Sequence, residues 1–401
     1  MRPTIILLSP PGSYYAYVLQ GMARAFEALG YPCAWRDNRL DFESLIPMIK
    51  QFNVAACLDI NRVLPHSVPW PGDVAHLAWI QDYRYEGLDL SGDLGASHHL
   101  YFFMEPSAFG LKLDDDRRWS LLLPGARGDV SVPDRADMCR DFCFAGFIPP
   151  PLADDLQVSV MPDGRPVDLA TFLTFLPPDL LHQSQLSVGE IRAAVREACR
   201  TIGCLQISEE SFLIFDEYLP RTLDRKALLE AIIGLGGSLD IFGPLTWRLW
   251  PQFAPFHRGH VVNPVDLDPI FQSSRINLHN SGMSMHHRVM DCLAAGGFLL
   301  VNETPRDFEA GGIRRYLEPD RHYGSYTVGD VAAVARHYLS DAEGRARIVA
   351  EGRREILASH TWWHRAAQVL HDLNLPIVPR SSPQRPPDTV AAPPRLESAL
   401  A

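Results

Sequence analysis

The feature that most constrains the fold is a series of short apolar runs separated by segments of helix length. In the first 125 residues these runs cover 4–9, 33–35, 54–60, 75–80 and 100–104. Runs of this kind, bounded by turn residues, are typical of βαβ units whose strands form a buried parallel sheet. Residues 15–29 have apolar side chains at helical spacing and end at Gly30. The first part of the chain therefore predicts a Rossmann-like α/β domain.

A polar, turn-rich stretch over residues 124–137 interrupts this pattern, and it predicts a domain boundary near residue 138. Strand-like runs return at 142–146, 238–242, 260–263, 276–280 and 298–302, and helical patterns fill 328–373. We therefore expect a first domain over residues 1–138 and a second α/β domain over 139–375. Residues 150–235 are mostly helical in pattern and predict an insertion. The Pro-rich tail, 376–401, carries little apolar content and is expected to be disordered.

Composition excludes several classes of protein. The chain has 401 residues and a net charge of −11, which argues against a nucleic-acid-binding protein. Its apolar runs are shorter than the ~18 residues that a membrane span requires, and the N-terminal run is too short for a signal peptide. The seven cysteines are scattered without a C-x-x-C pair, which favours free thiols in a cytoplasmic protein.

Residues 275–302 carry the clearest chemical signal. A strand ends at residue 280, a short loop follows, and a helix is predicted to begin at Ser284, a plausible N-cap. The backbone N–H groups of Ser281, Gly282 and Met283 would then lie beside the positive end of that helix. Such a setting suits a phosphate or pyrophosphate group.

Two charged side chains follow on this helix. Arg288 and Asp291 are three residues apart and share one face. Arg288 could add a charge-assisted contact to a diphosphate, and Asp291 could accept hydrogen bonds from ribose hydroxyls. The alternative is a surface helix with an ordinary arginine–aspartate pair.

The same segment resembles a known family. The run from Arg288 through Asp291, Ala294 and Gly296-Gly297 to Leu300 is similar to the R-x-F-E-A-x-A-C-G-G-F-L-L signature of CgeB-like glycosyltransferases, within the GT-B superfamily. Further matches follow the family's order at 141–146 (DFCFAG), 240–247 (DIFGPLTW), 275–279 (RINLH) and 360–365 (HTWWHR).

Three positions depart from the family pattern. Asp291 stands where the family usually has Glu, and Met290 stands where it has an aromatic residue. Met283 occupies the position of the first carboxylate in the E-x7-E pair of many retaining relatives. We therefore expect an inverting rather than a retaining transfer.

The resemblance implies a GT-B fold, in which two Rossmann-like domains face a central cleft. It implies a nucleotide-sugar donor in the second domain, bound without a metal or other cofactor, and Gly243 lies in the matched donor-side turn. A glycan, protein or small-molecule acceptor would enter from the first domain. Arg248 and Arg258 are weaker candidates for holding the diphosphate.

An inverting transfer needs a base on the first domain to deprotonate the acceptor hydroxyl. Asp82, after the run 75–80, is the first choice because catalytic groups gather at the carboxyl ends of parallel strands. Asp59 is the second choice, and strand-end capping or an ion pair is the alternative for both. His287, or its neighbour His286, could donate a hydrogen bond or a proton to the leaving group.

Two other functions stay open. A nucleotide-sugar 2-epimerase has the same architecture and acts on the donor without an acceptor. A degenerate, non-catalytic GT-B module would bind a glycan or a protein. A metal site is not expected, because residues 114–116 (DDD) lie in a charged loop and because His360 and His364 lack a third ligand at zinc-site spacing.

Overall fold

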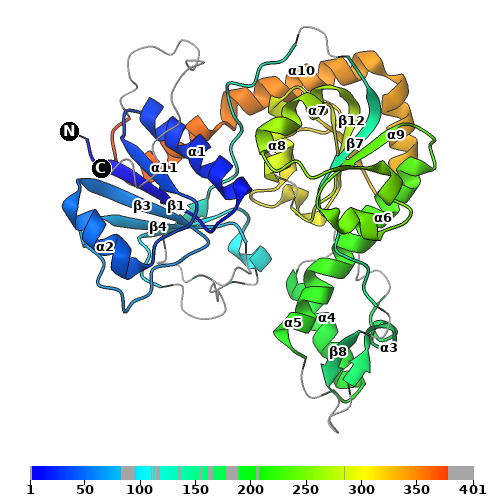
Figure 1. Cartoon of the computed structure of the whole chain (residues 1–401), viewed down its shortest axis with the longest axis horizontal. Coiled ribbons are helices and arrows are strands. Elements are labelled where there is room, and N and C mark those ends of the chain that lie inside the picture. The colour runs from blue at the N-terminus through cyan, green and yellow to red at the C-terminus, as the bar shows by residue number, and fades with distance from the viewer. Residues whose placement is uncertain are drawn as a thin grey trace.

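Two α/β domains lie side by side, and a smaller unit projects from the second (Figure 1). The computed structural model describes residues 2–82, 95–109, 111, 113, 118–133, 137–153, 156–160, 166–177, 188–204, 207–283 and 285–377. The predicted α/β class with two Rossmann-like domains is confirmed. Residues 114–116 and most of the Pro-rich tail lie outside the described residues.

The N-terminal domain is built on a sheet of parallel strands. Its strands are β1 (Thr4–Leu8), β2 (Cys33–Arg36), β3 (Val54–Ile60), β4 (Ala75–Ile80), β5 (His99–Phe102) and β6 (Trp119–Leu121), in the order β2-β1-β3-β4-β5-β6. Helices α1 (Ser13–Ala28) and α2 (Phe42–Gln51) pack against it. From β1 the chain first forms β2 on one side of β1, and it then returns to form β3 on the other side of β1. This leaves a switch point between β1 and β3, where ligands bind in such sheets.

The C-terminal domain repeats this plan. Its strands are β7 (Arg140–Ala145), β10 (Leu239–Phe242), β11 (His257–Gly259), β12 (Ser274–His279), β13 (Leu299–Asn302) and β14 (Gly324–Tyr326), all parallel, in the order β11-β10-β7-β12-β13-β14. Its helices are α6 (Leu219–Ile233), α7 (Asp268–Gln272), α8 (His287–Ala294), α9 (Val331–Ser340) and α10 (Ala342–Ser359). The switch point of this sheet lies between β7 and β12.

The projecting unit is smaller than the insertion expected over residues 150–235. It holds the antiparallel pair β8 (Gln157–Val160) and β9 (Pro166–Asp168) with α3 (Leu169–Leu173), α4 (Val188–Thr201) and α5 (Glu209–Leu213). It has a hydrophobic core of its own, centred on Phe172, Val195 and Phe215. Helix α6 is not part of it, because Leu228 and Ile232 pack in the core of the C-terminal domain.

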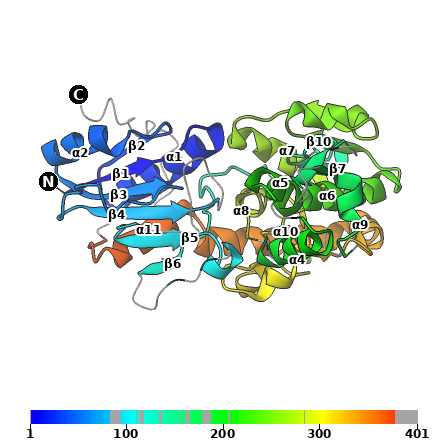
Figure 2. The ribbon, with the colours of Figure 1, turned by 90° about the horizontal axis from the view of Figure 1, so that it is seen from below.

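The last helix, α11 (Trp362–Asp372), returns to the N-terminal domain (Figure 2). The second domain therefore ends with α10 and does not extend to residue 375. The reason is the apolar face of α11, since Trp362, Ala366 and Val369 are buried in the N-terminal core against α1. Gly21 on α1 permits this contact, because a Cβ atom there would lie 2.5 Å from the Trp362 ring.

The two segments that cross between the domains are hydrogen-bonded to each other. The N–H of Ala126 donates to the carbonyl of His360 at 2.8 Å, and the N–H of Trp362 donates to the carbonyl of Ala126 at 3.0 Å. Arg365 also donates through Nε to the carbonyl of Pro124. The domains are thus joined on one side by a paired double strand of chain.

One local expectation differs from the structure. The strand expected at 260–263 is wrong, because β11 ends at Gly259, whose φ of +123° turns the chain away from β10. Among the described helices, none is long and apolar enough to cross a membrane. All seven cysteines are free thiols, and Cys139 is the exposed one.

Candidate functional site

Two arginines meet at the switch point between β7 and β12. Arg225, on α6, is 9% exposed and donates to the carbonyls of Phe147 and Asn280. Arg288, at the start of α8, donates through Nη1 to the carbonyl of Ala145 at 2.8 Å. Desolvation lowers the pKa of both guanidinium groups, and repulsion from Arg221 and then from Arg288 lowers the pKa of Arg225 further. Both charges therefore lie in a packed setting where the hydrogen-bond acceptors are neutral carbonyls.

Three histidines surround these arginines. His279 ends β12, and the rings of His286 and His287 stand beside the start of α8, with centroid distances of 5.3 Å from His279 to His286 and 3.9 Å from His286 to His287. Burial lowers the pKa of all three rings, that of His279 to about 3, and the neighbouring arginines act in the same direction. The rings are consequently neutral at physiological pH.

Several polar atoms in this cluster lack a hydrogen-bond partner among the described residues. They are Nε of Arg225, Nε2 of His279 and both amide atoms of Asn280. Buried polar groups in folded proteins are almost always paired, so unpaired polar atoms that gather at the carboxyl end of β12 indicate a ligand. A diphosphate matches this set, because its oxygens accept hydrogen bonds from arginine, histidine and amide donors.

The loop predicted to bind phosphate through its backbone is arranged differently. The N–H of Ser281 donates to Oδ1 of Asn302 at 2.9 Å, and the N–H of Met283 donates to Oγ of Ser281 at 3.1 Å. The predicted N-cap, Ser284, lies outside the described residues, and α8 begins later, at His287, with His286 as its N-cap. Two of the three amides are thus already used, and the side chains of the cluster provide most of the anion-binding capacity.

This loop nevertheless borders the interdomain cleft. Gly282 and Met283 line a narrow crevice together with Phe103 and Met104, which follow β5 of the N-terminal domain. The crevice therefore opens between the carboxyl ends of the two sheets.

Asp291 faces the other domain. Its Oδ1 accepts a hydrogen bond of 2.7 Å from the hydroxyl of Tyr17, on α1 of the N-terminal domain. The carboxyl is 5% exposed, and burial raises its pKa to about 7. One helical turn away, the rings of Tyr14 and His287 lie 4.2 Å apart. The carboxylate predicted to bind ribose is thus in contact with a tyrosine from across the cleft.

Asp82 lies on the N-terminal side of the cleft, two residues after β4. Its Oδ2 accepts from the hydroxyl of Tyr15 at 2.6 Å and from Nδ2 of Asn61 at 2.8 Å. Asp59, the second choice for the base, is fully buried and forms ion pairs with Arg62 and Arg39. The structure therefore leaves Asp82 as the better placed of the two carboxylates.

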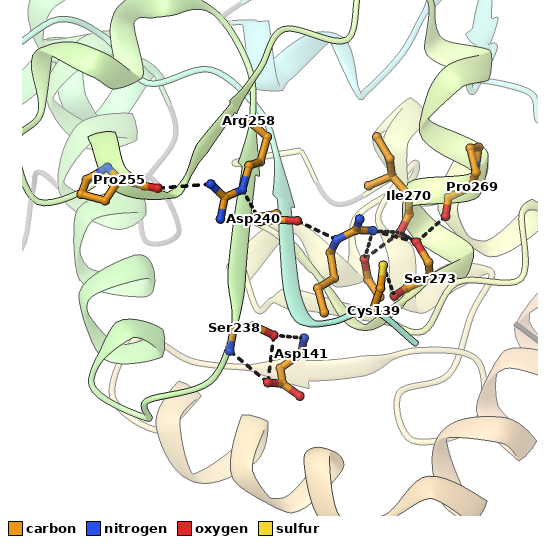
Figure 3. Close-up of polar contacts among 11 residues, drawn as sticks. Cys139, Asp141, Ser238, Asp240, Pro255, Arg258, Pro269, Ile270 and Ser273 are labelled. Atoms are coloured by element: carbon orange, nitrogen blue, oxygen red, sulfur yellow. Dashed lines mark hydrogen bonds and ion pairs between the residues drawn. The ribbon is translucent and has the colours of Figure 1, made fainter. Parts of the chain in front are cut away.

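Other predicted residues lie away from the cluster. Gly243 directly follows β10 and packs so closely that a Cβ atom would lie 2.0 Å from the carbonyl of Gly146. Arg248 donates to His257 at 3.3 Å. Arg258 pairs with Asp240 at 2.5 Å and reaches the carbonyl of Pro255, in a network that ties β10 and β11 together (Figure 3).

No group of three potential metal ligands occurs within the described part of the chain. His360 and His364, which have helical spacing, serve the chain itself. Nδ1 of His360 contacts Arg365, and Nδ1 of His364 accepts from the N–H of Thr361 at the start of α11.

Sequence reasoning missed Arg225, His279 and Tyr17. His279 could have been found, because it ends β12 directly before the predicted loop. Arg225 had no comparable signal, because its helix follows the insertion and is brought to β7 only by tertiary packing. Tyr17 likewise meets Asp291 across 274 residues of sequence.

Comparison with known proteins agrees with this architecture. Residues 221–371 match the model of a family described as glycosyl transferase-like, a region that begins in α6 and includes Arg225 and Arg288. No curated protein sequence matches the chain.

Similar solved structures include AviGT4, a glycosyltransferase involved in avilamycin A biosynthesis, with 10% identity and a TM-score of 0.52 over 93% of this chain and 97% of that one. Anabaena Alr3699/HepE in complex with UDP-glucose has 8% identity and a TM-score of 0.49, with 93% and 100% covered. TarM has 9% identity and a TM-score of 0.47, and the match covers 83% of this chain but 57% of TarM. The likeness to AviGT4 shows that the chain has the GT-B fold.

Proposed function

We propose that this protein is a glycosyltransferase that moves a sugar from a nucleoside diphosphate sugar to a hydroxyl group of an acceptor. The observation that carries the proposal is the pair of arginines, Arg225 and Arg288, at the switch point of the C-terminal sheet. They stand among neutral histidines and unpaired polar atoms, and the ring of His287, next to Arg288, contacts Tyr14 of the N-terminal domain. The glycosyl transferase-like match over residues 221–371 supports the same conclusion.

In this proposal the donor lies across the carboxyl ends of β7 and β12. Arg225 and Arg288 bind the diphosphate, and the loop of Ser281, Gly282 and Met283 borders it. Asp291 accepts hydrogen bonds from the ribose hydroxyls once Tyr17 releases it. Gly243, in the neighbouring turn after β10, contributes by letting this turn pack closely against the backbone of Gly146.

The transfer itself is proposed to be inverting. Asp82 takes the proton of the acceptor hydroxyl, whose oxygen bonds to the anomeric carbon while the bond from that carbon to the diphosphate oxygen breaks. The negative charge that develops on the leaving diphosphate is stabilised by the two guanidinium groups. His287, held neutral by burial, can donate a hydrogen bond to the same oxygens. Because these side chains supply the positive charge, we propose a metal-independent reaction.

The proposed subfamily and the proposed cellular compartment rest on the sequence. The motif at 288–300 supports membership of the CgeB-like subfamily, and the free thiols agree with a reducing compartment such as the cytoplasm.

Binding of nucleoside diphosphates tests the donor site. A thermal-shift and calorimetric panel of nucleoside diphosphates and their sugars should contain a ligand that raises the melting temperature of the wild type. Arg225→Gln and Arg288→Gln should each weaken it about tenfold or more, since hydrogen bonds to charged groups contribute about 1.5–3 kcal/mol. Arg258→Gln, which breaks an exposed ion pair with Asp240, is the matched control.

Equal affinity in all three variants would refute the donor site, and so would a panel without any ligand. Product analysis then separates the functions: a transferase needs an acceptor, a 2-epimerase alters the sugar of the donor alone, and a binding module does neither.

A further inference from the structure

Asn61, directly after β3, has an unusual backbone conformation. Its φ is +53°, in the left-handed region that non-glycine residues rarely adopt, and its side chain is 1% exposed. Asparagine tolerates this region better than most residues, but glycine would adopt it at lower cost. The backbone alone therefore does not account for an asparagine at this position, and the contacts of its amide side chain do.

The amide of Asn61 forms four hydrogen bonds at the end of β4. Its Oδ1 accepts from the N–H groups of Gln81 at 2.8 Å and Asp82 at 3.0 Å. Its Nδ2 donates to Oδ2 of Asp82 at 2.8 Å and to the hydroxyl oxygen of Tyr15 at 3.2 Å. These bonds use the full capacity of an amide side chain. Asn61 thus fixes both the backbone and the carboxylate of Asp82.

Tyr15 completes the arrangement from α1. Its hydroxyl donates to the same Oδ2 of Asp82 at 2.6 Å. Two donors therefore hold one carboxylate oxygen, while no hydrogen bond joins Oδ1 to another described residue. The carboxylate is fixed in one orientation, with its second oxygen available to a ligand.

We propose that Asn61 and Tyr15 are positioning residues that hold the carboxylate of Asp82 in the orientation needed to accept the proton of the acceptor hydroxyl. This inference rests on the proposed function, in which Asp82 is the base. Strained backbone at such a site persists when the surrounding bonds over-determine it, as the four bonds of the Asn61 amide do. Each donor that is lost leaves the carboxylate of Asp82 less restrained and more accessible to a reagent.

The first test measures Asp82 without a substrate. The full chain is labelled with a water-soluble carbodiimide and glycine ethyl ester at one fixed pH, and mass spectrometry follows the time course of labelling in the peptide that contains Asp82. Tyr15→Phe and Asn61→Gly each remove a donor to Oδ2, and glycine keeps the left-handed backbone. Labelling of Asp82 should be faster in each variant than in the wild type, because the carboxylate is held by one donor fewer.

Asn374→Gly is the matched control, because Asn374 also has a left-handed φ of +54° and lies exposed after α11. Its labelling curve should equal that of the wild type. If the curves of Tyr15→Phe and Asn61→Gly also equal that of the control, the positioning role is refuted. Tyr15→Phe is the milder variant and decides the matter if Asn61→Gly does not fold.

The second test separates this inference from the proposed function. With UDP-glucose, or whichever donor the binding panel finds, both variants should lower kcat at least tenfold at neutral pH and leave the donor dissociation constant unchanged. Transfer by Asp82→Asn at the wild-type rate would overturn Asp82 as the base and this inference with it, while the donor site would stand. A wild type that binds no nucleotide would refute the proposed function, and the labelling curve would still decide whether the two residues hold Asp82.

Discussion

Asp291→Asn should make the protein more stable at neutral and alkaline pH. The buried carboxyl of Asp291 has its pKa raised from 3.8 to about 7, mainly by loss of solvation. Because the folded state then disfavours the ionised form, the wild type loses stability as the pH rises from about 4 to about 7. Above pH 7 the loss is complete. The difference between 3.8 and about 7, at about 1.4 kcal/mol per pH unit, corresponds to about 4 kcal/mol.

The asparagine variant removes this charge and keeps the contact. Its amide oxygen can still accept the hydrogen bond from Tyr17, which measures 2.7 Å in the wild type. The stabilisation should therefore be largest at pH 8, about 4 kcal/mol, and should shrink towards zero near pH 4.

Urea denaturation at pH 4.5, 6 and 8, followed by tryptophan fluorescence, measures this dependence. The exposed Asp73, changed to Asn, serves as the control and should show no comparable trend. A difference between Asp291→Asn and wild type that stays constant with pH would contradict the argument, as would a variant less stable than wild type at pH 8.

Three further predictions concern packing and reactivity. Tyr17→Phe leaves the buried carboxyl of Asp291 without its donor and should lower the free energy of unfolding by about 1–3 kcal/mol in urea titrations; unchanged stability would show that the contact between the domains carries no energy. Gly21→Ala places a Cβ atom against the Trp362 ring and should lower the free energy of unfolding by about 1–3 kcal/mol through overpacking. Gly203→Ala, which has open space around its Cβ position but a strained φ of +71°, measures the backbone cost alone. Equal losses of stability in a thermal melt would argue against tight contact of α1 with α11. Ellman's reagent should titrate one thiol, Cys139, in the native protein and all seven after unfolding; a native protein in which Cys139→Ser still reacts would contradict this.

The hydrophobic pattern determined much of the fold. Strands such as β3 and β4 are buried on both faces, so they appear in the sequence as continuous apolar runs. The position of Asp82 at a cleft-facing strand end follows from the same rule, since the carboxyl ends of parallel strands meet at one edge of the sheet. The sequence predicted the ends of helices less well where a hydrogen bond to the backbone decides at which residue the helix begins. Helix α8 begins at His287, later in the chain than predicted, and the His286 ring accepts a hydrogen bond from the N–H of Arg288 there.

The sequence by itself determined that there are two α/β domains and that a charged helix follows β12. Both features depend on the spacing of apolar and charged residues within short consecutive segments. Only the tertiary structure decided that Arg225 joins Arg288, that Tyr17 meets Asp291, and that α11 returns to the first domain. Each of these contacts joins residues far apart in the chain. An amphipathic helix or a buried charge requires a partner, but the sequence does not say which surface supplies it, because that depends on how the two domains pack.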